Sequence, residues 1–246
     1  MKIAVFGAAG WLGRAIIENL GEQHDVRAVD TTAAAWSDDN PWQDGEIVNG
    51  DIVNYRDVTK AIDGMDAVVH SAVCHGPYGD NDDQPFLVNL KGLWNTLEAS
   101  RRHGITRVVH IGSCQVEHPM GIFFAADVRR PDGSLYAVTK RLQEEMCRQF
   151  YEAYEMPIAV LRPCSIVDSR TDTAKGGAKV GPGSWNMGIV CRHDIAEACR
   201  KAVERENPSF EVLHMAGAKG AEAHCNVDET RSVLDMTFEG DLEKYR

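Results

Sequence analysis

The chain has 246 residues, of which 43% are hydrophobic and 26% are charged, a composition typical of folded globular proteins and not of disordered ones. Its net charge of −11 would repel nucleic-acid phosphates and anionic lipids, so neither is expected as a partner. The seven cysteines are scattered and form no CxxC motif, which favours free thiols in a reducing compartment.

Short β-branched segments alternate with helical stretches along the chain, and this alternation predicts parallel βαβ units. The expected strands are 3–6, 26–29, 47–48, 67–70, 108–111, 158–161 and 212–215. The expected helices are 12–20, 58–62, 87–103, 135–154 and 193–204, with a weaker one within 228–246. The glycine-rich stretch 169–188 predicts a loop beside the sheet, where substrate contacts are common.

These elements predict an α/β fold with a doubly wound parallel Rossmann sheet. We expect a dinucleotide-binding domain over 1–168 and a small C-terminal substrate lobe over 169–246 that is interleaved with it. No run approaches about 18 apolar residues, and the N-terminal apolar run is too short for a secretory leader. The sequence therefore favours a cytoplasmic protein without a membrane partner.

A glycine motif follows the first expected strand, at the start of the first expected helix: Gly7-Ala8-Ala9-Gly10-Trp11-Leu12-Gly13. In this context the glycines permit a tight turn, a close backbone approach to a pyrophosphate and close helix–sheet packing. The pyrophosphate would lie at the helix N-terminus. The motif therefore predicts a dinucleotide site that includes Gly7, Gly10, Trp11, Leu12 and Gly13.

Acidic residues follow the next two strands. Asp30 ends the second strand, where a carboxylate accepts hydrogen bonds from ribose hydroxyls and repels a 2′-phosphate, so NAD is favoured over NADP. Asp51 and Ile52 follow the third strand, where the adenine edge would lie.

Tyr136 and Lys140 stand as Tyr-Ala-Val-Thr-Lys in a long expected helix, and the four-residue spacing places the phenol and the ammonium on one face. A nearby cation stabilises a phenolate and lowers its pKa from about 10 toward neutrality, which makes the tyrosine a usable acid and base. Ser113 follows the fifth strand, at the edge where such sheets bind ligands. Ser113, Tyr136 and Lys140 are therefore the candidate catalytic residues.

These motifs, in this order, resemble the extended short-chain dehydrogenase/reductases, the NAD-dependent epimerase/dehydratase family. The resemblance continues through His70-Ser71-Ala72, Asn89-Leu90-Lys91-Gly92, Arg162-Pro163 and His193-Asp194-Ile195-Ala196. It implies a Ser–Tyr–Lys triad in which Lys140 also holds the nicotinamide ribose, with Asn89 in a structural position beside the active-site helix. It also implies that the cofactor contacts Ser71, Ala72, Val73 and Pro163.

Within the family, the pattern is most similar to the short members related to uronate dehydrogenase, through the glycine motif, Arg130-Pro131-Asp132-Gly133, Ser165 and His193-Asp194. Two departures argue against uronate oxidation. The arginine that clamps the substrate carboxylate in those enzymes corresponds to a position near Trp185, and the Asn-His pair after their catalytic serine is Cys114-Gln115 here. The candidate substrate contacts are His75, Cys114, Gln115, Ser165 and Trp185.

The expected activity is therefore NAD-dependent oxidation or reduction of a CH–OH/carbonyl group in a small sugar or polyol-like substrate. An epimerase that retains its NAD is an alternative, although the small C-terminal lobe disfavours nucleotide-linked sugars. A non-catalytic dinucleotide-sensing protein is a second alternative, but such proteins typically lose the tyrosine or the lysine. His70, Cys74 and His75 match no common zinc spacing, so no metal is expected. The resemblance also implies a homodimer formed through the helices 87–103 and 135–154.

Overall fold

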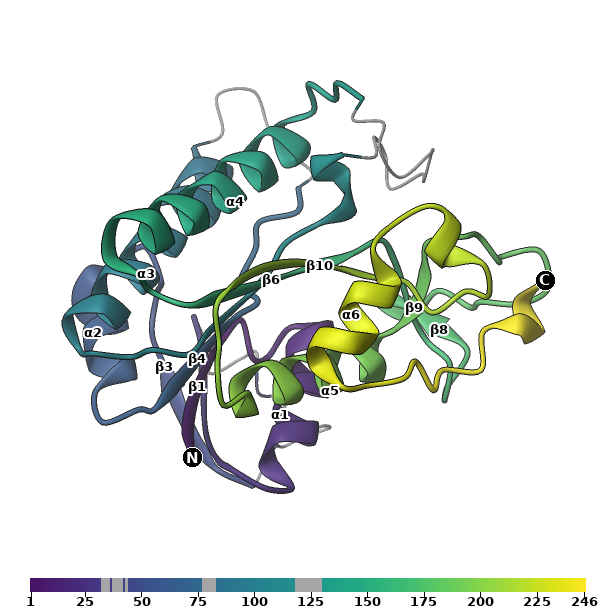
Figure 1. Ribbon diagram of the computed structural model, residues 1–246. Coiled ribbons are helices and arrows are strands. Elements are labelled where there is room, and N and C mark those ends of the chain that lie inside the picture. Colours follow the sequence, from purple (N-terminus) through teal and green to yellow (C-terminus); the bar gives the residue numbers. More distant parts are fainter. Residues whose placement is uncertain (32–35, 37–41, 43, 77–82, 118–129) are drawn as a thin grey trace.

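The computed structural model describes the whole chain except residues 32–35, 37–41, 43, 77–82 and 118–129. Its centre is a seven-stranded sheet in the order β10-β6-β5-β4-β1-β2-β3, and every neighbouring pair is parallel (Figure 1). The strands are β1 (Lys2–Phe6), β2 (Asp25–Asp30), β3 (Glu46–Asn49), β4 (Ala67–His70), β5 (Val108–Ile111), β6 (Ile158–Pro163) and β10 (Phe210–Met215). The expected doubly wound Rossmann architecture is confirmed.

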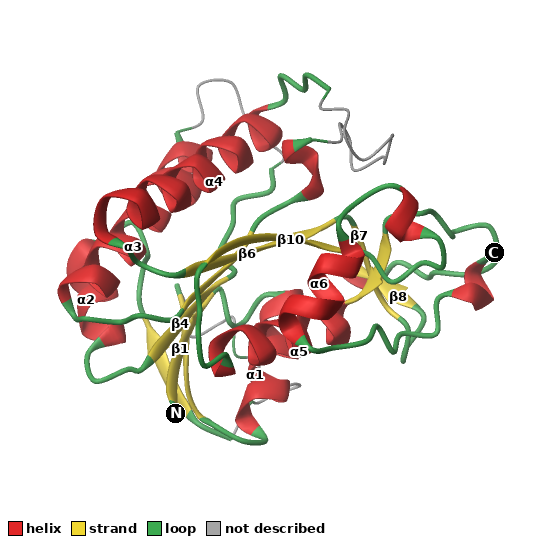
Figure 2. Cartoon of the chain, in the orientation of Figure 1, coloured by secondary structure: helices red, strands yellow, loops and turns green. Residues whose placement is uncertain are grey.

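Helices cover both faces of this sheet (Figure 2). On one side lie α1 (Trp11–Gly21), α5 (Arg192–Glu204) and α6 (Val227–Leu234), and on the other lie α2 (Tyr55–Ile62), α3 (Gly92–Arg102) and α4 (Leu135–Tyr154). Successive strand residues point to opposite faces, so Ile3 and Val5 belong to the first core and Ala4 and Phe6 to the second. Strands buried on both faces favour near-continuous apolar runs, and β1, β4 and β5 accordingly consist mostly of Val, Ile and Ala.

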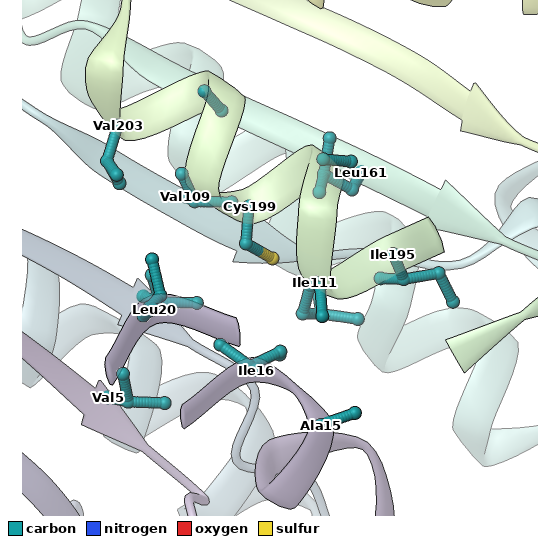
Figure 3. Close-up of a cluster of buried hydrophobic side chains, with 14 of the residues drawn as sticks. Val5, Ala15, Ile16, Leu20, Val109, Ile111, Leu161, Ile195, Cys199 and Val203 are labelled. Atoms are coloured by element: carbon teal, nitrogen blue, oxygen red, sulfur yellow. The ribbon is translucent and has the colours of Figure 1, made fainter. Parts of the chain in front are cut away.

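The core beneath α1 and α5 joins segments that are distant in sequence. Figure 3 shows Ile16 and Leu20 of α1 facing Ile195 and Cys199 of α5 above the central strands. All four side chains are fully buried. Burial of a large aliphatic side chain such as Ile16, Leu20 or Ile195 stabilises the fold by roughly 1.5–3 kcal/mol. At the rim, the Asn19 amide donates to Glu197 at 3.3 Å, so polar bonds also join the two helices.

The expected helix 87–103 is in fact two elements: a π-helical segment over Pro85–Lys91 and then α3. The wider turn contains Asn89, whose buried side chain bonds to the backbone N–H and C=O of Cys74 and to the hydroxyl of Thr139 in α4. π-Helical turns frequently occur at functional sites. The sequence did not reveal this one because its cause is a set of contacts between distant segments.

A small second sheet, in the order β8-β7-β9, builds the C-terminal lobe. Its strands are β7 (Ser165–Asp168), β8 (Thr173–Ala174) and β9 (Ile189–Cys191). From the sequence we expect a loop over 169–188 and no strand in the segments on either side of it, so β8 lies inside the expected loop and β7 and β9 flank it. The strands were missed because segments of two to four residues carry little periodicity and are stabilised by pairing with distant partners.

The strands of the two sheets alternate along the chain. Strand β7 precedes residue 169 and belongs to the small sheet, whereas β10 follows that residue and completes the main sheet, which α5 covers. The small lobe is closed by the last turn of the chain, where Tyr245 is buried and its hydroxyl donates to Asp172 at 2.7 Å. Within the described part of the chain, no helix combines the length and apolarity needed to cross a bilayer.

Candidate functional site

A cavity of about 730 Å³ opens where β1, β2, β4 and β5 end. This is the carboxyl edge of the sheet, where doubly wound folds bind ligands. The structure brings every residue predicted for the cofactor to its wall: Gly7, Gly10, Trp11, Leu12, Gly13, Asp30, Asp51, Ile52, Ser71, Ala72, Val73, Tyr136, Lys140 and Pro163. Cys164, Ile166 and Lys175, which no sequence motif indicated, line the same cavity from the segments beyond β6.

The glycine loop forms one wall of this cavity. A Cβ on Gly13 would lie 2.1 Å from the Gly7 carbonyl oxygen, so no side chain fits between the start of α1 and the loop. Gly7 has a φ of +76°, and a Cβ there would lie 2.6 Å from the backbone nitrogen of Ala72. At Gly10 a Cβ would meet the Gly7 oxygen at 3.1 Å, which is tighter than ordinary contact, and a side chain there would also occupy space in the cavity that Gly10 lines. The loop thus combines tight packing with an open surface at a helix N-terminus, which suits a pyrophosphate.

Asp30 stands at the end of β2 on the cavity wall. Its carboxylate accepts hydrogen bonds from the backbone N–H of Ala9 at 2.9 Å and of Thr31 at 2.8 Å. These bonds hold a negative charge in a fixed position beside the glycine loop. That position can receive two ribose hydroxyls and would repel a phosphate.

Lys140 is buried, with 2% of its surface exposed, although it lines the cavity. Its ammonium donates to the backbone carbonyl of Ile111, the last residue of β5, at 2.8 Å. Burial lowers the pKa of Lys140 to about 7. The Nζ atom lies 5.8 Å from the centre of the Tyr136 ring, as the predicted four-residue spacing requires.

The start of α4 sets the position of Tyr136. The Ser134 hydroxyl accepts a hydrogen bond from the Ala137 N–H at 3.3 Å and caps the helix, so Tyr136 lies in the first turn. Arg141, one turn further on, donates to the carbonyls of Gln115 at 3.3 Å and Val116 at 2.9 Å. The helix is thereby joined to the segment that follows β5.

A second cavity, of about 420 Å³, adjoins the first. Its walls include Ser113, Cys114, Gln115 and Ser165, and it shares His75, Tyr136, Pro163, Cys164 and Ile166 with the larger cavity. Ser113 faces only this smaller space, and its hydroxyl oxygen accepts a hydrogen bond from the Gln115 N–H at 3.1 Å, so its own proton can be donated toward the cavity. Tyr136 therefore stands where the two cavities meet. We call the cavity of about 730 Å³ the long cavity and the one of about 420 Å³ the compact cavity.

His75 stacks on the catalytic candidate Tyr136, with ring centres 5.0 Å apart and ring planes inclined by 19°. Burial, together with the nearby positive charges of Lys175 and Lys140, lowers the pKa of His75 to about 4. The imidazole is therefore neutral at neutral pH. It can exchange hydrogen bonds with a polar substrate without adding charge to the site.

The structure does not bring Trp185 to either cavity. This residue packs in the core of the small lobe, where its backbone N–H donates to the Tyr245 carbonyl at 3.1 Å and the Arg246 guanidinium lies 4.2 Å from its ring centre. The expected substrate contact at Trp185 is therefore wrong, because β9 and the last turn of the chain direct this segment into the core of the small lobe. Among the described residues, no group of three or more His, Cys, Asp and Glu side chains is arranged to hold a metal ion.

The comparison with known proteins agrees with this geometry. Residues 3–182 match the NAD dependent epimerase/dehydratase family. The uronate dehydrogenase of Agrobacterium fabrum is 30% identical over 171 residues, which are 65% of this chain, and the matched region spans only 60% of that enzyme's length. The L-arabinose 1-dehydrogenase (NAD(P)(+)) of Haloferax volcanii is 26% identical over 230 residues, 84% of each chain.

Among solved structures, the UDP-glucuronic acid 4-epimerase of Bacillus cereus in complex with NAD has a TM-score of 0.78 and 20% identity. The superposition covers 100% of this chain and 96% of that one. At this level of identity the similarity concerns the fold alone.

We predict that Asp30 sets the cofactor preference. The wild-type protein should bind NAD at least about tenfold more tightly than NADP, because about 1.4 kcal/mol of repulsion from a 2′-phosphate gives that ratio. In Asp30→Ala the ratio should fall, and calorimetric titration of both dinucleotides measures it. Equal affinities of the wild-type protein for NAD and NADP would contradict the role of this carboxylate.

We predict that Lys140→Met makes the ligand-free protein more stable near pH 7. The folded-state pKa of about 7 lies below the reference value of 10.5, so the unfolded chain binds more protons between these two pH values. The buried ammonium therefore lowers the free energy of unfolding of the wild-type protein most at and below pH 7, by on the order of a few kcal/mol. This destabilisation declines toward pH 10.5. Losing the bond to Ile111 offsets part of the gain.

Thermal unfolding of the wild-type and Lys140→Met proteins at about pH 7 and about pH 9 tests the sign of this change in stability. Buried lysines are residues in which such large pKa shifts arise. The melting temperature should rise by several degrees at the lower pH and by less at the higher pH. Lys60→Met, on the exposed surface of α2, is the control and should change little at either pH. A pH-independent loss of stability in Lys140→Met would show that burial of the Lys140 charge does not destabilise the folded protein.

Proposed function

The chain belongs to the NAD-dependent epimerase/dehydratase family, and from this premise we propose that it is an NAD-dependent oxidoreductase that interconverts a CH–OH group and a carbonyl in a small, neutral sugar or polyol. The observation that carries the proposal is the position of Tyr136 on the walls of both cavities. A proton-transferring phenol at that junction can reach a substrate in the compact cavity while a dinucleotide occupies the long one.

The long cavity fits NAD. The first turn of α1, which begins at Trp11, presents backbone N–H groups that have no partner within the helix, and Asp30 supplies an anchored carboxylate for the adenosine ribose. At the opposite end, the Lys140 ammonium would hold the nicotinamide ribose. Bound NAD supplies the hydride acceptor for the substrate carbon.

The proton is handled by residues of this chain. In the oxidative direction, the Tyr136 oxygen removes the proton from the substrate hydroxyl while Ser113 donates a hydrogen bond to the same oxygen. The Lys140 ammonium, held on Ile111, favours the phenolate through its positive charge. Holding the reacting groups about 3–3.5 Å apart supplies much of the expected acceleration.

The compact cavity supports a neutral substrate. Its walls offer hydroxyl, amide, imidazole and thiol groups, and none of its described lining residues is Arg, Lys, Asp or Glu. Such a wall matches sugar hydroxyls and provides no direct partner for a carboxylate. Its volume of about 420 Å³ also favours a free sugar over a nucleotide-linked one.

A thermal-shift panel tests the proposal. The protein is screened with NAD, NADH, NADP and NADPH, each alone and together with neutral sugars, sugar acids and nucleotide sugars. A ligand at 100 times its dissociation constant stabilises the fold by about 2.7 kcal/mol. We expect the largest additional shift with a neutral sugar or polyol, followed by NADH formation with that compound.

Other outcomes of the same panel support the other functions. A largest shift with a nucleotide sugar, and sugar interconversion without net NADH, would indicate an epimerase that retains its cofactor. NAD binding without conversion of any compound would indicate a dinucleotide-sensing protein.

With the substrate from the panel, we predict that Tyr136→Phe reduces turnover by about 10²–10⁴-fold, the usual range for lost general acid–base catalysis. NAD affinity should change little, because the ring and its packing on His75 remain. Ser113→Ala should also lower turnover while NAD binding stays nearly intact, whereas Lys140→Met should lower both. Near-normal turnover of Tyr136→Phe would reject the mechanism.

We also propose a homodimer formed through α3 and α4. The exposed apolar side chains Trp94 and Leu142 lie on these two helices, with 45% and 46% of their surfaces accessible. Light scattering coupled to size exclusion should give a dimer, and Trp94→Glu with Leu142→Glu should give a monomer because charge is excluded from an apolar interface. Ile47→Glu, an equally exposed apolar position on β3, is the control and should leave the dimer intact.

A further inference from the structure

Two cysteines meet in the compact cavity. Cys114 follows β5 and Cys164 follows β6, and both line the wall between Ser113 and Ser165. Neither position matches a redox motif in the sequence, because the two residues are separated by the whole of α4. Their proximity follows only from the pairing of the strands.

The register of β5 and β6 brings the two residues opposite each other. Ile111 pairs with Leu161, and the Gly112 N–H donates to the Leu161 carbonyl at 2.7 Å, so the strands remain side by side beyond the end of β5. Ser113 is extended, with φ −161° and ψ 144°. Cys114 and Cys164 each lie three positions after the Ile111–Leu161 pair, and their thiols are within hydrogen-bonding reach of each other. Neighbouring strands lie about 4.7–4.9 Å apart, within the Cα separation that disulfides require. Cys114 begins the 3₁₀ helix Cys114–Val116 and Cys164 stands between β6 and β7, so both thiols lie just beyond the paired segment.

The two thiols differ in chemical character. The hydrogen bond from Cys114 lowers the pKa of Cys164, and the same bond raises the pKa of Cys114 well above its ordinary value. Cys164 is half-buried and reaches both cavities, whereas Cys114 is almost fully buried. A thiolate at an accessible position is the form that reacts with peroxides, and a neighbouring thiol is what converts the product to a disulfide.

We propose that Cys114 and Cys164 are a redox modification site that forms a reversible disulfide when hydrogen peroxide enters the compact cavity. The Cys164 thiolate attacks one peroxide oxygen and the O–O bond breaks, giving a sulfenic acid and a hydroxide that takes up the thiol proton as water. The Cys114 sulfur then loses its proton and displaces the sulfenic hydroxyl as a second water while the S–S bond forms. Two thiols are oxidised by two electrons, and one peroxide is reduced to two waters.

Cys225 is the competing partner. It is also buried near this pair, but burial raises its pKa to about 12 and its thiol donates to the Ala221 carbonyl at 3.5 Å. It therefore remains a protonated thiol with its hydrogen committed elsewhere. The geometry assigns the disulfide to Cys114 and Cys164.

The proposed disulfide would join the residues that flank Ser113 and Ser165. The linked segment would narrow the compact cavity, while the glycine loop and Asp30 lie on other strands. We expect that oxidised protein retains its thermal stabilisation by NAD. If the proposed function holds, turnover should fall at least tenfold on oxidation and return with dithiothreitol.

Peptide mapping tests the link without reference to turnover. All seven cysteines fall on different tryptic peptides, so a non-reducing map of native protein after peroxide and alkylation identifies every pair. We expect one linked species that joins the Cys114 and Cys164 peptides and disappears with dithiothreitol. The Cys225→Ser protein should form the same link.

Single substitutions separate the two steps. In Cys114→Ser, a dimedone adduct should accumulate on Cys164, because the sulfenic acid has lost its resolving thiol. In Cys164→Ser, Cys114 should stay reduced. A native link between Cys164 and Cys225, or oxidation of Cys164 to the sulfinic acid without any link in the wild-type protein, would overturn the proposal. Failure of the proposed function would leave this map unchanged.

Discussion

The hydrogen bond from Lys140 to the carbonyl of Ile111 fixes the spacing on which the whole site depends. It is a contact between a buried ammonium and the last residue of β5, at 2.8 Å. Ile111 lies two residues before Ser113. The bond therefore holds the N-terminal part of α4 over the carboxyl edge of the sheet, close to Ser113. Burying the ammonium also destabilises the site, since burial lowers the lysine pKa to about 7.

Polar groups around this bond hold the neighbouring segments in place. Asn89 ties the chain after β4 to Thr139 of α4, and Arg162 of β6 pairs with Glu144 of the same helix at 2.8 Å. Helix α4 is therefore connected to three consecutive strands of the sheet by buried polar contacts. Paired polar contacts of this kind rigidify a site, and here they hold the residues between the two cavities.

The main sheet, its covering helices and the cofactor wall could be predicted from the sequence because their signals are local. Each strand carries its own apolar run, and the glycine loop and Asp30 follow directly from strand ends. The π-helical segment around Asn89, the small sheet and the Cys114–Cys164 contact could not, because each arises from segments that meet only in the fold. Trp185 shows the limit most clearly, since counting along the chain cannot reveal a segment that turns into another core.

Helix α1 shares its core with a helix from the far end of the chain, and this has a consequence for folding during synthesis. Ile16 and Leu20 need Ile195 and Cys199 to cover them, and the His24 imidazole reaches Glu204 at 2.8 Å. At about 5–20 residues per second, the ribosome adds the intervening segment in roughly 10 to 40 seconds. For that interval one face of the nascent sheet exposes apolar side chains to water, and transiently exposed apolar surface is prone to aggregation until α5 has emerged to cover it.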